Sequence, residues 1–234
     1  MQLSTDKILA EIKDGVGWLT INNPERRNAI SLEMWVAMGE AIQAFTDDAA
    51  VRCVVMTGAG DKAFASGADI SQFEKQRSNA EAAEAYARIS KGERAKLQAF
   101  EKPLIASIHG FCMGGGLGIA MAADIRIATN TSVFAIPAAR LSIAYDMNNI
   151  RQLVGLVGPS RAKEILITGR RYSATEAAEM GLINRCVTKE SLDGEIADLT
   201  SRIVENAPLS MRASKLTVNQ VMLDQADRDM PMVD

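Results

Sequence analysis

Two glycine-containing turns hold the residues of this sequence best suited to chemistry. They are Phe64-Ala65-Ser66-Gly67-Ala68-Asp69-Ile70 and His109-Gly110-Phe111-Cys112-Met113-Gly114-Gly115-Gly116-Leu117-Gly118. The second turn ends an apolar run and opens a predicted helix, where backbone N–H groups lack partners and the helix dipole favours negative charge. Paired N–H groups from the two turns would form an oxyanion hole for a carbonyl that gains negative charge. Tight turns with close helix–sheet packing explain the glycines equally well.

Other kinds of site have little support in the sequence. His109 is the only histidine, and the cysteines at 53, 112 and 186 are isolated, so we predict no metal site. Gly58-Ala59-Gly60-Asp61-Lys62-Ala63 fits a dinucleotide fingerprint only loosely, which leaves a dinucleotide-dependent oxidoreductase as a weak alternative. The net charge of −3 argues against nucleic acid as the main partner.

The elements that must position these turns alternate between strands and helices. Residues 8–13 and 16–21 predict a hairpin, and Ser31 is placed to cap a helix with Leu32, Trp35, Met38, Ile42 and Phe45 on one face. Residues 51–57, 104–108 and 124–128 predict buried strands, and residues 80–100, 115–123 and 160–168 predict helices. Ser173-Ala174-Thr175-Glu176 is a capping box that opens another helix. The pattern predicts the α/β class.

Residues 103–123 carry no charged side chain and are long enough to cross a membrane. Pro103 and the glycine cluster favour a strand, a turn and a packed helix instead. We therefore predict no membrane segment. The N-terminal residues show no secretion signal, so a cytoplasmic protein is expected.

The ordered series of motifs along the chain resembles the crotonase superfamily, also called the enoyl-CoA hydratase/isomerase family. The matching segments are Leu19-Thr20-Ile21-Asn22-Asn23-Pro24, Arg27-Asn28-Ala29-Ile30, Phe64-Ala65-Ser66-Gly67-Ala68-Asp69-Ile70, Lys102-Pro103, Gly114-Gly115-Gly116, Ala122-Ala123-Asp124-Ile125-Arg126-Ile127-Ala128, Gly169-Arg170, Ala177 and Met180-Gly181-Leu182-Ile183-Asn184. One such segment would be weak evidence, but all of them in this order are highly specific.

The resemblance implies a spiral of ββα turns over residues 1–190 and a helical C-terminal segment over 191–234, assembled as a homotrimer or hexamer. It implies a coenzyme A thioester from fatty acid metabolism as the substrate, with no tightly bound cofactor. The oxyanion-hole N–H groups fall on Ser66 and Gly115, and coenzyme A lies near Arg27, Ala29, Ala65, Ala68, Asp69 and Ile70. Arg26 and Arg27 are candidate phosphate partners, or a solvated basic loop. Family members normally continue with a further C-terminal helix, so the sequence is expected to be truncated.

The sequence departs from the family where hydratases carry two glutamates. Those positions match Gly118 and Ala138, and neither residue can transfer a proton. The matched substrate-pocket residues are Gly114, Gly118, Pro137, Ala138 and Leu141, and the small side chains predict a wider, more apolar pocket. Ordinary two-glutamate hydration is therefore unexpected.

Asp146 is the candidate acid or base that replaces the glutamates, because dienoyl-CoA isomerases resemble the stretch Leu141-Ser142-Ile143-Ala144-Tyr145-Asp146 and carry a catalytic aspartate at its last position. Tyr145 is its candidate hydrogen-bond partner or a proton donor. The alternative is that Asp146 caps a helix that begins near Met147.

Three functions remain open at this point. The first is an acyl-CoA enzyme that stabilises a thioester enolate, as an isomerase, lyase or hydrolase. The second is a non-catalytic acyl-CoA-binding or scaffold protein, and the third is a hydratase that uses other acid–base groups.

Overall fold

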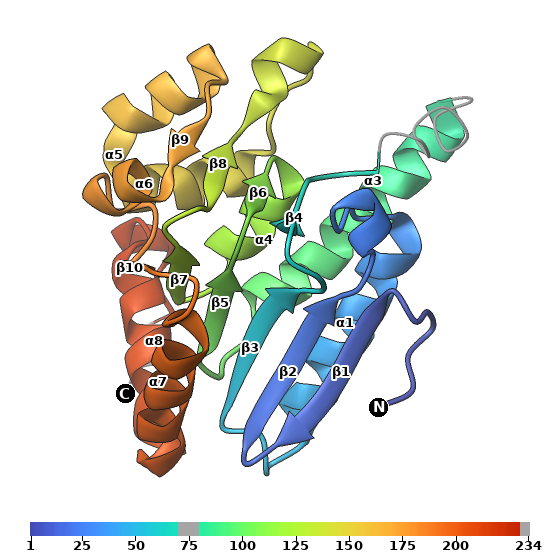
Figure 1. The fold of residues 1–234 in the computed structure, drawn as a ribbon. Coiled ribbons are helices and arrows are strands. Elements are labelled where there is room, and N and C mark those ends of the chain that lie inside the picture. Colours follow the sequence, from blue (N-terminus) through green and yellow to red (C-terminus); the bar gives the residue numbers. More distant parts are fainter. Residues whose placement is uncertain (70–79, 230–234) are drawn as a thin grey trace.

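The computed structural model describes residues 1–69 and 80–229. A six-stranded sheet in the order β1-β2-β3-β5-β7-β10 forms its centre (Figure 1). Its strands are β1 (Ile8–Lys13), β2 (Val16–Ile21), β3 (Cys53–Gly58), β5 (Leu104–Ile108), β7 (Ile125–Thr129) and β10 (Arg185–Val187). Within this sheet, β1 and β2 pair antiparallel, as the predicted hairpin, and the described pairs from β2 to β10 are parallel.

Helices cover both faces of this sheet, which confirms the predicted α/β class. Val54 and Met56 of β3 share a core cluster with α1 (Leu32–Asp47), whereas Cys53 and Val55 share one with α7 (Leu192–Glu205). Because successive strand residues point to opposite faces, both sets become buried, as the continuous apolar run predicts. Ser31 caps α1 by accepting the Met34 N–H at 3.3 Å, also as predicted.

A second sheet in the order β4-β6-β8-β9 lies beside the first and carries the two glycine turns (Figure 1). Its strands are β4 (Ala63–Ala65), β6 (Phe111–Met113), β8 (Val133–Ala135) and β9 (Tyr172–Ser173). β4 leads into the first turn and β6 into the second. Strands of two or three residues are too short to show a periodicity, so the sequence did not predict this sheet.

The remaining helices are α3 (Ala80–Gln98), α4 (Gly115–Met121), α5 (Met147–Thr168), α6 (Ala174–Glu179) and α8 (Pro208–Val221), with short 3-10 turns η1 (Pro24–Arg26), η3 (Pro137–Leu141) and η4 (Gln225–Asp227). α5 begins well before the predicted residue 160, and Gly158, with φ of 74°, interrupts its helical geometry just before Pro159. None of the helices in the described ranges is long and apolar enough to cross a membrane.

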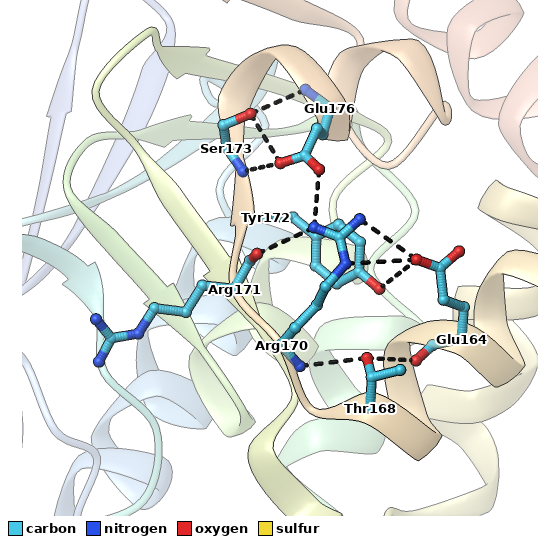
Figure 2. Close-up of polar contacts among 7 residues, drawn as sticks. All are labelled: Glu164, Thr168, Arg170, Arg171, Tyr172, Ser173 and Glu176. Carbon is cyan, nitrogen blue, oxygen red and sulfur yellow. Dashed lines mark hydrogen bonds and ion pairs between the residues drawn. The ribbon is translucent and has the colours of Figure 1, made fainter.

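A polar network joins the end of α5 to β9 and α6 (Figure 2). The predicted capping box is present, since Ser173 Oγ accepts the Glu176 N–H and Glu176 accepts the Ser173 N–H. The Arg170 guanidinium lies 3.6 Å from the Tyr172 ring centroid and pairs with Glu176 at 2.8 Å and Glu164 at 3.3 Å. This network fixes the outer edge of the second sheet.

Candidate functional site

The segments that contain the predicted coenzyme A contacts run side by side. The Ser66 N–H donates to the Arg27 carbonyl oxygen at 3.0 Å, the Ile30 N–H to the Gly67 oxygen at 2.8 Å and the Asp69 N–H to the Ile30 oxygen at 3.0 Å. Asn28 fixes the segment around Arg27, because its buried amide donates to the carbonyl oxygens of residues 59 and 63. The tertiary structure therefore brings together residues that lie about forty positions apart.

This pairing decides which N–H group of the first turn is available. Ile30 forms a parallel bridge with Ala68 and uses both its N–H and its C=O toward Gly67 and Asp69, so the Ala68 N–H points away from Ile30. It donates to no acceptor among the described residues. The Ser66 N–H, by contrast, is committed to Arg27. The Ser66 N–H is therefore not free, contrary to the prediction, and the available N–H group of this turn is that of Ala68.

The second turn presents the Gly115 N–H at the start of α4. Gly114 is the N-cap with φ of 49° and ψ of −115°, a conformation suited to glycine. As the first helical residue, Gly115 has no acceptor for its N–H within the helix, and the other described residues offer none. Gly116 lets the two turns approach, because a Cβ there would come within 2.3 Å of the Ala65 carbonyl oxygen.

The two available N–H groups lie close to each other. A Cβ built on Gly115 would lie 3.7 Å from the Ala68 nitrogen, and one built on Gly67 would lie 3.6 Å from the Gly115 nitrogen. Two backbone donors from separate turns, one of them at a helix N-terminus, can hold an oxygen that gains negative charge. The backbone supplies both donors, so no side chain in the sequence identifies them directly.

The small size of Gly118 predicts extra space in the pocket, but other side chains fill that space. A Cβ at Gly118 would meet Asn149 Nδ2 at 3.1 Å and Tyr145 Oη at 3.3 Å. Asn149 is 1% exposed, and its Oδ1 has no hydrogen-bond partner among the described residues. The expectation of a wider, apolar pocket is wrong at this position, because two polar side chains from the loop and first turn of α5 occupy the space.

Asp146 is the N-cap of α5. Its Oδ1 accepts the Asn148 N–H at 3.0 Å and the Asn149 N–H at 3.3 Å, which confirms the capping alternative. Tyr145 does not bind Asp146: its hydroxyl donates to the Gly114 carbonyl oxygen at 3.0 Å. Burial raises the pKa of Tyr145 above its ordinary value, so the phenol keeps its proton at neutral pH.

The other predicted coenzyme A contacts differ in exposure. Arg27 is exposed, and its guanidinium lies 5.4 Å from the Phe111 ring centroid. Asp69 pairs with Arg26 at 3.2 Å. Ala29 and Ala65 are buried, so they support the loops and offer no side chain to a ligand. Ile70 lies outside the described residues.

The other predicted pocket residues follow β8. Pro137 packs against Gly114, since its Cδ would lie 3.8 Å from a Cβ there. Ala138 is buried and begins the η3 turn with Pro137, whereas Leu141 at the end of η3 is 50% exposed. Pro137 therefore borders the Gly114–Gly115 turn.

His109 and Cys112 show no sign of a catalytic role. Burial lowers the pKa of His109, and the charges that act on the ring come from Asp61, Lys189 and Asp193, none of which is a residue of the two turns. Cys112 is fully buried, and burial raises the pKa of its thiol, as expected for a small core residue. No group of metal-ligating side chains occurs within residues 1–69 and 80–229.

The sequence did not predict that Asn149 lies against Gly118. It predicted Ala68 only as a coenzyme A contact and not as a backbone donor. The stretch Asp146-Met147-Asn148-Asn149 signals a helix cap, but not that the fourth residue turns inward against Gly118. The direction of the Ala68 N–H depends on pairing with residue 30, which no local pattern reveals.

Comparison with known proteins shows the family to which the chain belongs. The profile of the enoyl-CoA hydratase/isomerase family matches residues 11–230. The crotonyl-CoA hydratase of Syntrophomonas wolfei is 36% identical over 228 residues, which cover 97% of this chain and 87% of the relative. The carnitinyl-CoA dehydratase of Salmonella agona is 36% identical over 200 residues, 84% of this chain and 74% of the relative.

Solved structures show the same architecture. An enoyl-CoA hydratase/carnithine racemase from Magnetospirillum magneticum superposes with a TM-score of 0.90 at 35% identity, covering 96% of this chain and 86% of the other. The fold is therefore the crotonase fold, as the motif series predicts. The chain belongs to the enoyl-CoA hydratase/isomerase family.

Proposed function

We propose that this chain acts on a coenzyme A thioester and stabilises its enolate between the backbone N–H groups of Ala68 and Gly115. The observation that carries the proposal is that these two donors, from separate turns, lie close together and have no acceptor among the described residues. A thioester carbonyl that accepts both hydrogen bonds makes its α-proton more acidic, because the enolate oxygen gains the charge that the donors stabilise.

Two-glutamate hydration is not part of the proposal. Gly118 and Ala138 stand at the positions that the family resemblance assigns to the glutamates, and Asn149 and Tyr145 occupy the space beside Gly118. Asp146 stays the candidate base, because the α5 cap uses only Oδ1 of its carboxylate. No described residue donates a hydrogen bond to Oδ2.

A second candidate is an acyl-CoA-binding protein without turnover. The observation that favours it is the lack of a carboxylate at Gly118 and Ala138, together with the use of Asp146 as a cap. Both candidate functions need the same thioester site. A measurement of proton transfer therefore distinguishes them, whereas a measurement of binding does not.

The test is exchange of the α-protons of butyryl-CoA in deuterated water, followed by mass spectrometry. An enzyme that forms the enolate incorporates deuterium, whereas binding without exchange supports the second candidate. Absence of both binding and exchange refutes the proposal. Loss of the conjugated-thioester absorbance of crotonyl-CoA, measured in parallel, would show that another group activates water.

A pair of variants isolates the Gly115 donor. Gly115→Pro removes the N–H at the first helical position, where proline is well tolerated. Gly115→Ala adds a Cβ in the same place but keeps the N–H. We expect the proline variant to exchange about 10²–10³-fold more slowly than the alanine variant, the usual effect of removing one oxyanion donor. Equal rates in the two variants would remove Gly115 from the site.

A further inference from the structure

The hydroxyl of Tyr145 binds the same peptide unit that carries the Gly115 donor. It donates to the Gly114 carbonyl oxygen at 3.0 Å, and the Gly118 N–H donates to the same oxygen at 3.0 Å. The Gly114 C=O and the Gly115 N–H point in opposite directions because the peptide between them is trans. Tyr145 and Gly118 therefore hold one end of this peptide while its other end faces the neighbouring turn.

No side chain of its own fixes the orientation of this peptide. Gly114 has no side chain, and its left-handed φ of 49° is one that glycine adopts with few restraints. Its N–H donates to the Ala135 oxygen at 2.8 Å, which fixes the preceding peptide. The rotation that would turn the Gly115 N–H away is therefore opposed by the two hydrogen bonds to the Gly114 oxygen.

Tyr145 is itself held firmly. Asp146 caps α5 immediately after it, and Gly118 leaves room for its hydroxyl, which would lie only 3.3 Å from a Cβ at that position. A larger residue at 118 would compete with the hydroxyl for this space. Gly118, which stands where the family resemblance places a glutamate, therefore also leaves room for the Tyr145 hydroxyl.

We infer that Tyr145 is a positioning residue that orients and polarises the Gly114–Gly115 peptide, so that the Gly115 N–H binds the thioester oxygen more strongly. The inference rests on the proposed function, since it needs a carbonyl at that N–H. A carbonyl that accepts hydrogen bonds makes the N–H of its own peptide a better donor, by about 10–30% per bond.

The test compares Tyr145→Phe with Tyr172→Phe. Tyr172 is a matched control because it is buried and its hydroxyl contacts Glu164 at 3.3 Å in the network of Figure 2, outside the proposed site. Removing one oxyanion donor usually slows the reaction about 10²–10³-fold. If the Tyr145 hydrogen bond contributes about 10–30% of that donor's effect on the activation free energy, Tyr145→Phe should lower kcat for α-proton exchange roughly two- to eightfold. KM and the thermal midpoint should change no more than in Tyr172→Phe.

A spectroscopic readout separates positioning from a structural role. Hydrogen bonding to the carbonyl of bound hexadienoyl-CoA shifts its absorbance to longer wavelength, and this shift should decrease in Tyr145→Phe but not in Tyr172→Phe. Site-specific 3-fluorotyrosine at position 145, a stronger donor, should increase it, and this measurement does not depend on the phenylalanine variant folding. Equal shifts in all these proteins would overturn the inference. A wild-type protein that binds the thioester without any shift would refute the proposed oxyanion hole itself.

Discussion

Replacing Gly118 by alanine tests the packing that distinguishes this site. The added Cβ would meet Asn149 Nδ2 at 3.1 Å and Tyr145 Oη at 3.3 Å, so both side chains must shift. Overpacking of this kind costs about 1–3 kcal/mol. The helix gains about 1 kcal/mol from alanine over glycine. We therefore expect Gly118→Ala to lower the free energy of unfolding by about 0–2 kcal/mol, the difference between these two effects.

Two other helical glycines provide the reference. A Cβ at Gly92 of α3 or at Gly194 of α7 would meet no atom within 4 Å. In each of these alanine variants the free energy of unfolding should therefore rise by up to about 1 kcal/mol, from helix propensity alone. Urea unfolding of all three variants at one protein concentration measures the contrast, because any self-association makes stability concentration-dependent.

The double variant Gly118→Ala/Asn149→Ala shows whether the contact itself is responsible. If Asn149 obstructs the new methyl group, the two changes should couple by about 0.5–3 kcal/mol, so that the second relieves part of the first. The reasoning is refuted if Gly118→Ala stabilises the protein as much as Gly92→Ala does. In that case Asn149 and Tyr145 would not lie against Gly118.

Two further predictions concern stability. Lys102 Nζ donates to the carbonyl oxygens of Phe45 at 2.7 Å and Asp48 at 2.8 Å at the end of α1, so Lys102→Met should cost about 1.5–3 kcal/mol in urea unfolding. Lys7→Met, which breaks an exposed ion pair, should cost less than about 1 kcal/mol, and equal losses would contradict the capping role. Hydrogen bonds, first from the Ser173 backbone N–H and then from Arg170, lower the pKa of Glu176 from 4.5 to about 2. Its contribution to stability is therefore complete above pH 4.5 and is lost as the pH falls toward 2. Glu176→Gln should flatten that part of the stability profile measured by urea unfolding, and an unchanged slope would show that the Figure 2 network does not titrate through this carboxylate.

How well the sequence predicted an element depended on the length of that element. The hairpin, the Ser31 cap, the buried strand β5 and the capping box at Ser173 were all predicted, because each depends on neighbours a few residues away. The second sheet was not predicted, since its short strands are stabilised by partners elsewhere in the chain. Assembly as a trimer or hexamer stays a prediction.

The sequence by itself determined the family, the two glycine turns and the absence of carboxylates at 118 and 138, because these are matters of residue identity and order. Only the tertiary structure decided that the Ala68 N–H is available and the Ser66 N–H is not, that Asp146 caps α5 and that Tyr145 binds Gly114. These outcomes depend on the direction of single N–H and O–H groups. Such directions are fixed by pairing and packing between segments far apart along the chain, which residue types alone do not specify.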